Sequence, residues 1–210
     1  MADTQHEPGP AHLVRRARAR DLAALAAVQD ASTALLAAHV GDVGGTPLGP
    51  PAPPGRARTE QPGFLLVAAA GAGGEGAVVG FAHVLVLDPA DPRAHLEQLS
   101  VDPAHGRGGI GTALVLAALG ESARDGLPTL SLCTFRDVAF NAPLYARLGF
   151  AEPSPLRHYQ RDLRHRERRA GLDRLGERVV LERRTRARDP GCEARHPSRW
   201  GPRPRDSMRA

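Results

Sequence analysis

The sequence predicts one domain of the α/β (α+β) class, in which helices flank a mixed β-sheet. Three observations lead to this prediction. Short apolar runs typical of strands alternate with Ala/Leu-rich stretches typical of helices, and glycines and prolines separate them. A length of 210 residues suits one domain with extensions. The apolar fraction of 41% is enough for a core, and that core must be rich in Leu, Val and Ala because only 4% of the residues are aromatic.

The first part of the chain places one helix among three strands. A short strand over residues 13–16 precedes Asp21, which we expect to cap a helix that reaches about residue 38. Residues 40–61 are dense in glycine and proline and predict a loop. Two further apolar runs with closely spaced glycines between them predict a hairpin, with strands over residues 64–69 and 78–87.

A glycine-rich loop joins the next strand, over residues 94–101, to a helix that ends at about residue 124. Gly106, Gly108 and Gly111 lie in this loop. Glycines let backbone N–H groups approach a ligand, and a helix N-terminus is electropositive, so the loop predicts a phosphate site. The spacing also fits the dinucleotide fingerprint, but four residues separate the strand from the first glycine, which argues against that fold. An ordinary helix-entry loop stays the other alternative.

The last part of the chain predicts two more strands and one short helix. Residues 129–135 have the pattern of a strand, and residues 141–148 that of a helix that ends at Gly149. From residue 150 onward we expect extended structure, with a final strand over residues 178–183.

Charge is distributed unevenly along the chain. Residues 1–150 hold 11 arginines against 14 acidic residues, whereas residues 151–210 hold 17 arginines against 9. Residues 185–210 are rich in arginine and proline, which predicts a disordered tail, and residues 1–11 are expected to be a flexible N-terminus. Nucleic acid is therefore not expected as a partner. Binding through the tail stays an alternative, and strongly salt-dependent retention would reveal it.

Cysteine usage and the N-terminal sequence favour a cytoplasmic protein. Cys133 and Cys192 have no metal-ligand spacing and form no disulfide framework, so neither a metal nor an oxidising compartment is expected. Residues 1–10 lack the layout of a signal peptide. Polar residues interrupt the apolar stretch over residues 22–40, so a membrane span is not expected.

Two ordered motifs make the chain resemble the GNAT superfamily of N-acetyltransferases. Four residues separate Val101, the expected end of the strand, from Gly106, the first glycine of the loop. Asn141 and Tyr145 then form an Asn-x-x-x-Tyr motif about 30 residues downstream, followed by Leu-Gly-Phe at residues 148–150. The resemblance covers roughly residues 12–184, which it marks as the catalytic domain. It implies a largely antiparallel sheet that is splayed at strands 4 and 5, and acetyl-CoA as the cosubstrate.

The resemblance also assigns the contacts with acetyl-CoA. Gly106 stands where the family usually has Gln or Arg, and Arg107 follows one position later, from where it would supply the missing charge. Asn141 would cap its helix, reach the pantetheine arm, or do both. The residues that the resemblance places at the cofactor are Leu99, Ser100, Val101, Gly106, Arg107, Gly108, Gly109, Ile110, Gly111, Thr112 and Asn141.

Tyr145 and Glu97 are the candidate catalytic residues. The resemblance makes Tyr145 the proton donor to the departing thiolate, with a tyrosine that merely packs against the helix as the alternative. Strand alternation places His95, Glu97, Leu99 and Val101 on one face. Glu97 is the candidate general base on the resemblance and His95 the reserve, although an edge or splayed position would also explain a polar residue there.

The sequence thus predicts an acetyl-CoA-dependent N-acetyltransferase. The acetyl group would pass to a primary amine by direct attack in a ternary complex. The alternative is a GNAT-fold module that binds acyl-CoA without turnover, which a thiol-release assay over a panel of amines would distinguish. The sequence does not identify the acceptor, and it leaves open a homodimer.

Overall fold

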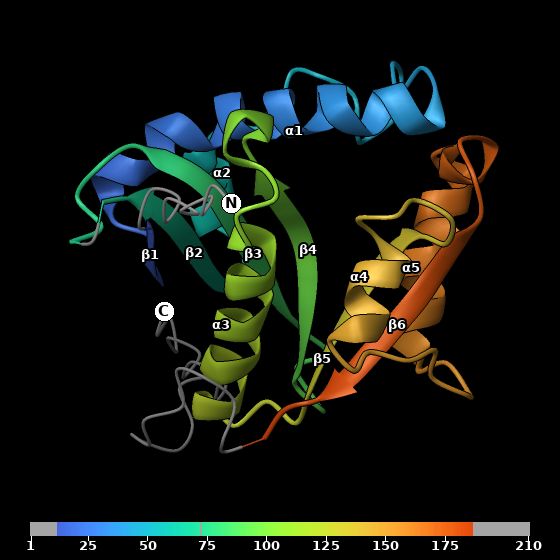
Figure 1. The fold of residues 1–210 in the computed structure, drawn as a ribbon. Helices are drawn as coiled ribbons and strands as arrows, with labels where there is room; N and C mark the ends of the chain where they lie inside the picture. Colours follow the sequence, from blue (N-terminus) through green and yellow to red (C-terminus); the bar gives the residue numbers. More distant parts are fainter. Residues whose placement is uncertain (1–11, 72, 187–210) are drawn as a thin grey trace, which may run out of the picture.

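A six-stranded sheet organises the protein, in the order β1-β2-β3-β4-β5-β6 (Figure 1). The computed structural model describes residues 12–71 and 73–186. The expected flexible N-terminus and nearly all of the expected tail lie outside these residues. The strands are β1 (His12–Arg16), β2 (Gly63–Ala70), β3 (Val78–Leu87), β4 (Arg93–Val101), β5 (Thr129–Phe135) and β6 (Arg178–Arg184).

Strands β4 and β5 form the parallel pair of this sheet, and the other neighbouring strands pair antiparallel. The parallel pairing runs only from Ala94 opposite Leu130 to Leu96 opposite Leu132. Both strands continue beyond it, and they diverge (Figure 1). The predicted mixed, largely antiparallel sheet with a splay at strands 4 and 5 is confirmed.

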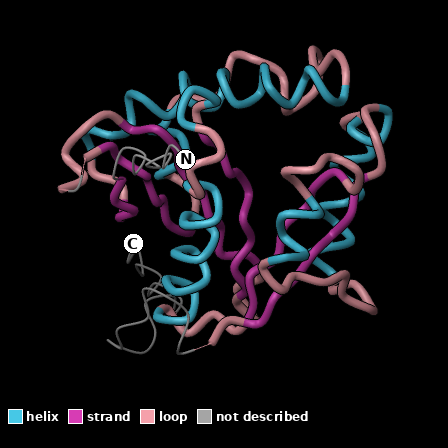
Figure 2. The backbone as a smooth tube through the Cα atoms, in the orientation of Figure 1, coloured by secondary structure: helices cyan, strands magenta, loops and turns pink. Residues whose placement is uncertain are grey.

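Helices cover both faces of the sheet (Figure 2). Side chains of β2 alternate between two apolar clusters: Leu66 and Ala68 share one with α3, and Leu65 and Val67 share the other with α1. The described helices are α1 (Leu25–Val40), α2 (Gly55–Thr59), α3 (Ile110–Arg124), α4 (Ala142–Arg147) and α5 (His158–Arg169), with 3₁₀ turns at Ala19–Ala24, Pro103–His105 and Leu172–Arg174.

Asp21 does not cap α1, contrary to the sequence prediction. A 3₁₀ turn precedes the helix, and Asp21 lies inside that turn, where its carboxylate accepts a hydrogen bond from the Arg18 backbone N–H at 2.6 Å. Arg15 donates to the same carboxylate and, by this hydrogen bond, lowers the pKa of Asp21 below its usual value. Asp21 is the third residue of this turn, which begins six residues before the helix, and Arg18 occupies the N-cap position of the turn.

Two helices lie where the sequence predicted none. The expected loop over residues 40–61 contains α2, and the expected extended structure after residue 150 contains α5. Helix α5 consists mainly of charged residues and buries only Tyr159, Gln160 and Leu163. Its apolar signal is therefore too sparse for a periodicity argument.

The stretch Ala19–Val40 has the length and the mean hydropathy, 1.2, of a helix that could cross a membrane. In this structure its residues Leu25 and Val28 pack into the core against β2 and β3. That the stretch is not a membrane span stays a prediction.

His83 on β3 makes stability depend on pH. It is 2% exposed, and neither ring nitrogen makes a hydrogen bond of normal geometry with the described residues. Burial, assisted by the charge of Arg58, lowers its pKa from 6.5 to about 4. Between these two pH values the unfolded chain takes up a proton that the folded chain does not, so acid favours unfolding.

We predict that His83→Leu flattens this pH dependence. The free energy of unfolding of the wild type should fall between pH 6.5 and 4, with His83 contributing roughly 1 kcal/mol per pH unit. Denaturant unfolding at pH 7 and pH 5 measures the difference. His165→Leu, at an exposed position of α5, is the matched control and should keep the wild-type slope. An unchanged slope in His83→Leu would contradict the assignment.

Candidate active site

The divergence of β4 and β5 places a cavity of about 570 Å³ beside the glycine loop. We call it the loop cavity. The end of β4, the loop, the first turn of α3, helix α1 and helix α4 form its walls. Ten of the residues predicted from sequence line it: Leu99, Val101, Gly106, Arg107, Gly109, Ile110, Gly111, Thr112, Asn141 and Tyr145.

The loop presents unused backbone donors at the N-terminus of α3. Among the described residues, the N–H groups of residues 107–112 find no backbone acceptor. Gly109 caps the helix with φ +75°, and Arg107 has φ +60°, a left-handed conformation that is strained for a side chain of this kind. A Cβ on Gly108 would meet only the His105 carbonyl, at 3.7 Å, so packing does not require a glycine there. This arrangement suits an anion that approaches the backbone closely.

The free edge of β4 faces the same gap. The Asp102 N–H donates to the Val79 carbonyl of β3 at 2.9 Å. Backbone directions alternate along a strand, so the N–H and C=O groups of Leu99 and Val101 point the other way, toward the edge that β5 has left. An extended ligand could pair with them as an added strand.

Ser100 lies away from the loop cavity. It is 1% exposed, and its hydroxyl accepts a hydrogen bond from Gln98 Nε2 at 2.9 Å. Its side chain therefore lies on the opposite face of β4, and its backbone pairs with Phe81 of β3 rather than facing the free edge. Contact of Ser100 with the cofactor stays a prediction.

Tyr145 and Asn141 enter the loop cavity from α4. The Tyr145 ring packs edge-on against Phe150 with a centroid distance of 5.7 Å, and burial raises the pKa of its hydroxyl well above the usual value. Tyr145 therefore keeps its proton at neutral pH. Asn141 occupies the N-cap position, but its side chain makes no capping hydrogen bond, so capping does not explain this side chain.

A second cavity of about 560 Å³ adjoins the first along β4. We call it the α5 cavity, because α5 forms one wall and β3 to β6 contribute the others. Gln98 lines the α5 cavity and the next residue, Leu99, lines the loop cavity. Successive residues of β4 thus line the two cavities, beyond the point where the pairing of β4 with β5 ends.

Glu97 stands in the α5 cavity at a bulge in β4. The register with β3 shifts there: His83 pairs with Gln98 and Val84 with Leu96, which leaves Glu97 unpaired. The predicted strict alternation is therefore wrong, because Leu96 and Leu99 pack on the same core cluster across the bulge. The Glu97 side chain is 46% exposed into the cavity, and partial burial raises the pKa of its carboxyl.

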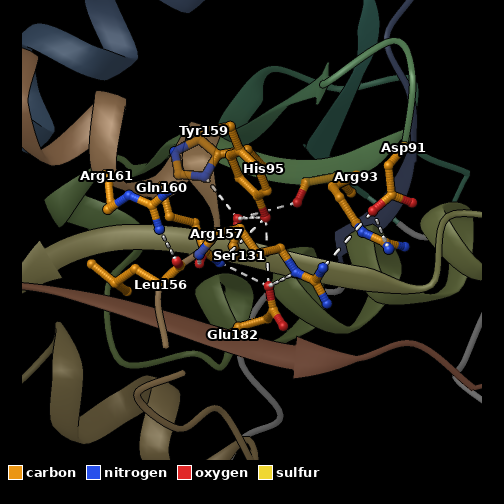
Figure 3. Close-up of polar contacts among 11 residues, drawn as sticks. Asp91, Arg93, His95, Ser131, Leu156, Arg157, Tyr159, Gln160, Arg161 and Glu182 are labelled. Carbon is orange, nitrogen blue, oxygen red and sulfur yellow. Dashed lines mark hydrogen bonds and ion pairs between the residues drawn. The ribbon is translucent and has the colours of Figure 1, made fainter. Parts of the chain in front are cut away.

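His95 lies behind Glu97 and starts a buried polar network (Figure 3). Its Nδ1 is 3.0 Å from the Ser131 hydroxyl, which is 3.2 Å from the Tyr159 hydroxyl. Gln160 donates to Glu182 at 2.8 Å. Burial lowers the pKa of His95 to about 3, so the ring is neutral. The network fastens α5 to β4, β5 and β6, and the sequence analysis missed it because its members are far apart in the chain.

Cys133 also lines the α5 cavity. Burial raises the pKa of its thiol to about 12, so the nucleophilic thiolate is absent at neutral pH. Within residues 12–71 and 73–186, no group of three or more His, Cys, Asp or Glu side chains is arranged to hold a metal ion.

Comparison with known proteins identifies the family of this chain. Residues 46–150 match the Acetyltransferase (GNAT) family. The chain therefore belongs to the GNAT acetyltransferase family, and it is a GNAT-family acyltransferase.

Solved structures show the same fold. The PaiA N-acetyltransferase from Thermoplasma acidophilum, solved with coenzyme A, is 16% identical with a TM-score of 0.58, and covers 83% of this chain and 99% of its own. The ribosomal-protein-S18-alanine N-acetyltransferase from Escherichia coli is 19% identical with a TM-score of 0.56, and the match covers 83% of this chain and 94% of that one. N-acetylglutamate synthase from Neisseria gonorrhoeae, solved with coenzyme A and N-acetyl-glutamate, is 18% identical with a TM-score of 0.59; 84% of this chain matches 35% of that one.

We predict that Gln160→Leu destabilises the protein by about 1–3 kcal/mol. Gln160 is fully buried, and its removal leaves the Glu182 carboxylate, which is 15% exposed, without its shortest hydrogen bond. Denaturant unfolding measures the change. His165→Leu on the exposed side of the same helix should change stability by less than about 0.5 kcal/mol. Equal effects of the two substitutions would show that the network does not hold α5.

Proposed function

We propose that this protein transfers an acetyl group from acetyl-CoA to the nitrogen of a primary amine. The observation that carries the proposal is that successive residues of β4 line two cavities at the β4–β5 divergence, with Tyr145 in one and Glu97 in the other. Direct transfer needs a donor and an acceptor that reach one reacting centre from two sides. The names of the structurally similar N-acetyltransferases, and the coenzyme A bound to one of them, support the same reaction.

The loop cavity fits coenzyme A. The free N–H groups of residues 107–112 suit the pyrophosphate, and Arg107 beside them adds a positive charge. The free edge of Leu99 and Val101 suits the amide groups of pantetheine, and Asn141 is placed to contact the same arm. Acetyl-CoA would supply the acetyl group as a thioester, whose C–S bond breaks as the amine nitrogen forms its bond to the carbonyl carbon.

Glu97 and Tyr145 provide the two proton transfers that this reaction needs. The Glu97 carboxylate takes a proton from the acceptor ammonium and so frees the nitrogen lone pair for attack. Its raised pKa makes it a better base than an ordinary glutamate. Tyr145 keeps its proton at neutral pH and gives it to the leaving sulfur. The proton count balances, because one proton is taken from the amine and one is returned to the thiol.

We predict that Tyr145→Phe lowers kcat by roughly 100-fold. The substitution keeps the ring that packs on Phe150 and removes the hydroxyl proton. A thiol-release assay over a panel of amines measures kcat, and calorimetry with coenzyme A measures binding, which should stay within about twofold of wild type. An unchanged kcat would remove Tyr145 from the mechanism. Tight binding of acetyl-CoA without turnover of any amine by the wild type would favour an acyl-CoA-binding module instead.

We predict that Glu97→Gln changes the pH profile of kcat/KM. Wild-type activity should fall in acid as Glu97 takes up a proton, with a midpoint above pH 4.5 because the pKa is raised. The variant should lose activity most at neutral pH and recover toward high pH, where the amine loses its proton without help. Glu152→Gln, at an exposed ion pair with Arg136, is the control and should keep the wild-type profile. A Glu97→Gln profile parallel to that of the wild type would exclude Glu97 as the base.

A further inference from the structure

The α5 cavity contains four charged side chains: Glu97, Arg166, Glu167 and Arg178. Two of them are already neutralised within the protein. Glu167 forms an ion pair with Arg178 and a second one with Arg164, at 2.6 Å. Arg164 also pairs with Asp173, at 2.8 Å, so two arginines and two carboxylates balance one another, and neither Glu167 nor Arg178 needs a ligand to balance its charge.

The other two charged side chains of the cavity, Glu97 and Arg166, lie outside this group of ion pairs. They do not form an ion pair with each other, and the nearest basic group to Glu97 is the neutral His95, at 3.8 Å. Within the described part of the chain, the Arg166 side chain makes no hydrogen bond or ion pair, although its backbone carbonyl accepts one from the Ala170 N–H. Burial is the main influence on the pKa of Glu97, and Arg166 exerts the strongest opposing charge effect, so the two groups share one electrostatic environment.

The position of Arg166 is set by a helix that is fixed at both ends. Near its N-terminus, Tyr159 and Gln160 join the buried network of Figure 3. Near its C-terminus, Glu167 is held by the ion pair with Arg178 of β6. The backbone that carries Arg166 is therefore held in place, while the guanidinium itself is left without a partner at the cavity wall.

The remaining walls of the α5 cavity are mostly apolar, among them Pro62, Leu85, Leu87, Leu163 and Leu172. A volume of about 560 Å³ holds a small molecule. The cavity thus offers the free carboxylate of Glu97 on β4, the free guanidinium of Arg166 on α5, and an apolar surface.

We propose that the acceptor is a small zwitterion: a primary amine that also carries a carboxylate, as a free amino acid does. This inference rests on the proposed acetyl transfer. The ammonium group meets Glu97 and the carboxylate meets Arg166, whose planar guanidinium binds carboxylates through two parallel hydrogen bonds. An amine without an anionic group leaves Arg166 unpaired, and a polyamine adds further positive charge beside this unpaired arginine.

The test compares amino acids with their amides, which differ only in the carboxylate. Leucine, methionine, phenylalanine, glutamine and glutamate are each assayed against the corresponding amino-acid amide by thiol release. For at least one pair, the wild type should prefer the free acid by 10-fold or more in kcat/KM. Arg166→Ala should reduce that preference to about threefold or less. Because the same pair is compared in both proteins, the different amine pKa values of acid and amide cancel.

Arg169→Ala is the matched control, since it removes the same charge from the same helix at a residue that does not line the cavity. It should keep the full preference. Turnover of amides equal to that of acids, or a preference that survives in Arg166→Ala, would overturn the zwitterion proposal and leave acetyl transfer standing. Coenzyme A binding without turnover of any acceptor would instead count against acetyl transfer. In that case, calorimetry measures the binding of the same acids and amides to the coenzyme A complex. Tighter binding of the acids that Arg166→Ala abolishes would support the role of Arg166. Equal binding of acids and amides would overturn it.

Discussion

The early end of the pairing between β4 and β5 is the constraint on which the rest of the structure depends. After three residue pairs the two strands separate, although each continues for several residues. Unpaired backbone groups inside a fold are costly, so such an edge persists only where something else satisfies it. Here the edge opens into the loop cavity on one side and the α5 cavity on the other. If β4 and β5 paired along their whole length, both cavities would be closed.

Burial then sets the chemistry on each side of the gap. It keeps Tyr145 protonated and His95 neutral, and it raises the proton affinity of Glu97. Each of these effects has the same cause, which is the cost of placing a charge where water is scarce. The polar network that begins at His95 offsets part of this cost. Hydrogen bonds join Ser131, Tyr159 and Gln160 to one another and to Glu182. The same network holds α5, which carries Arg166 at the wall of the α5 cavity.

Local patterns in the sequence were enough to predict most strands, the glycine loop and α3. Apolar runs, turn residues and glycines that expose the backbone predict such elements. Helix α5 could not be predicted this way, because it is held to the sheet mainly by polar contacts of Tyr159 and Gln160 and by ion pairs. The bulge at Glu97 leaves no mark in the strand pattern, since it is a property of the pairing with β3. Arg166 carried no signal at all until the fold placed α5 beside β4.

A crystal structure of the complex with coenzyme A tests the central claim most directly. The account predicts the pyrophosphate on the N–H groups of residues 107–112, pantetheine along Leu99 and Val101, and the thiol at the junction of the two cavities, within hydrogen-bonding reach of Tyr145. Coenzyme A bound outside the loop cavity, or a thiol that points away from the gap between β4 and β5, would contradict it.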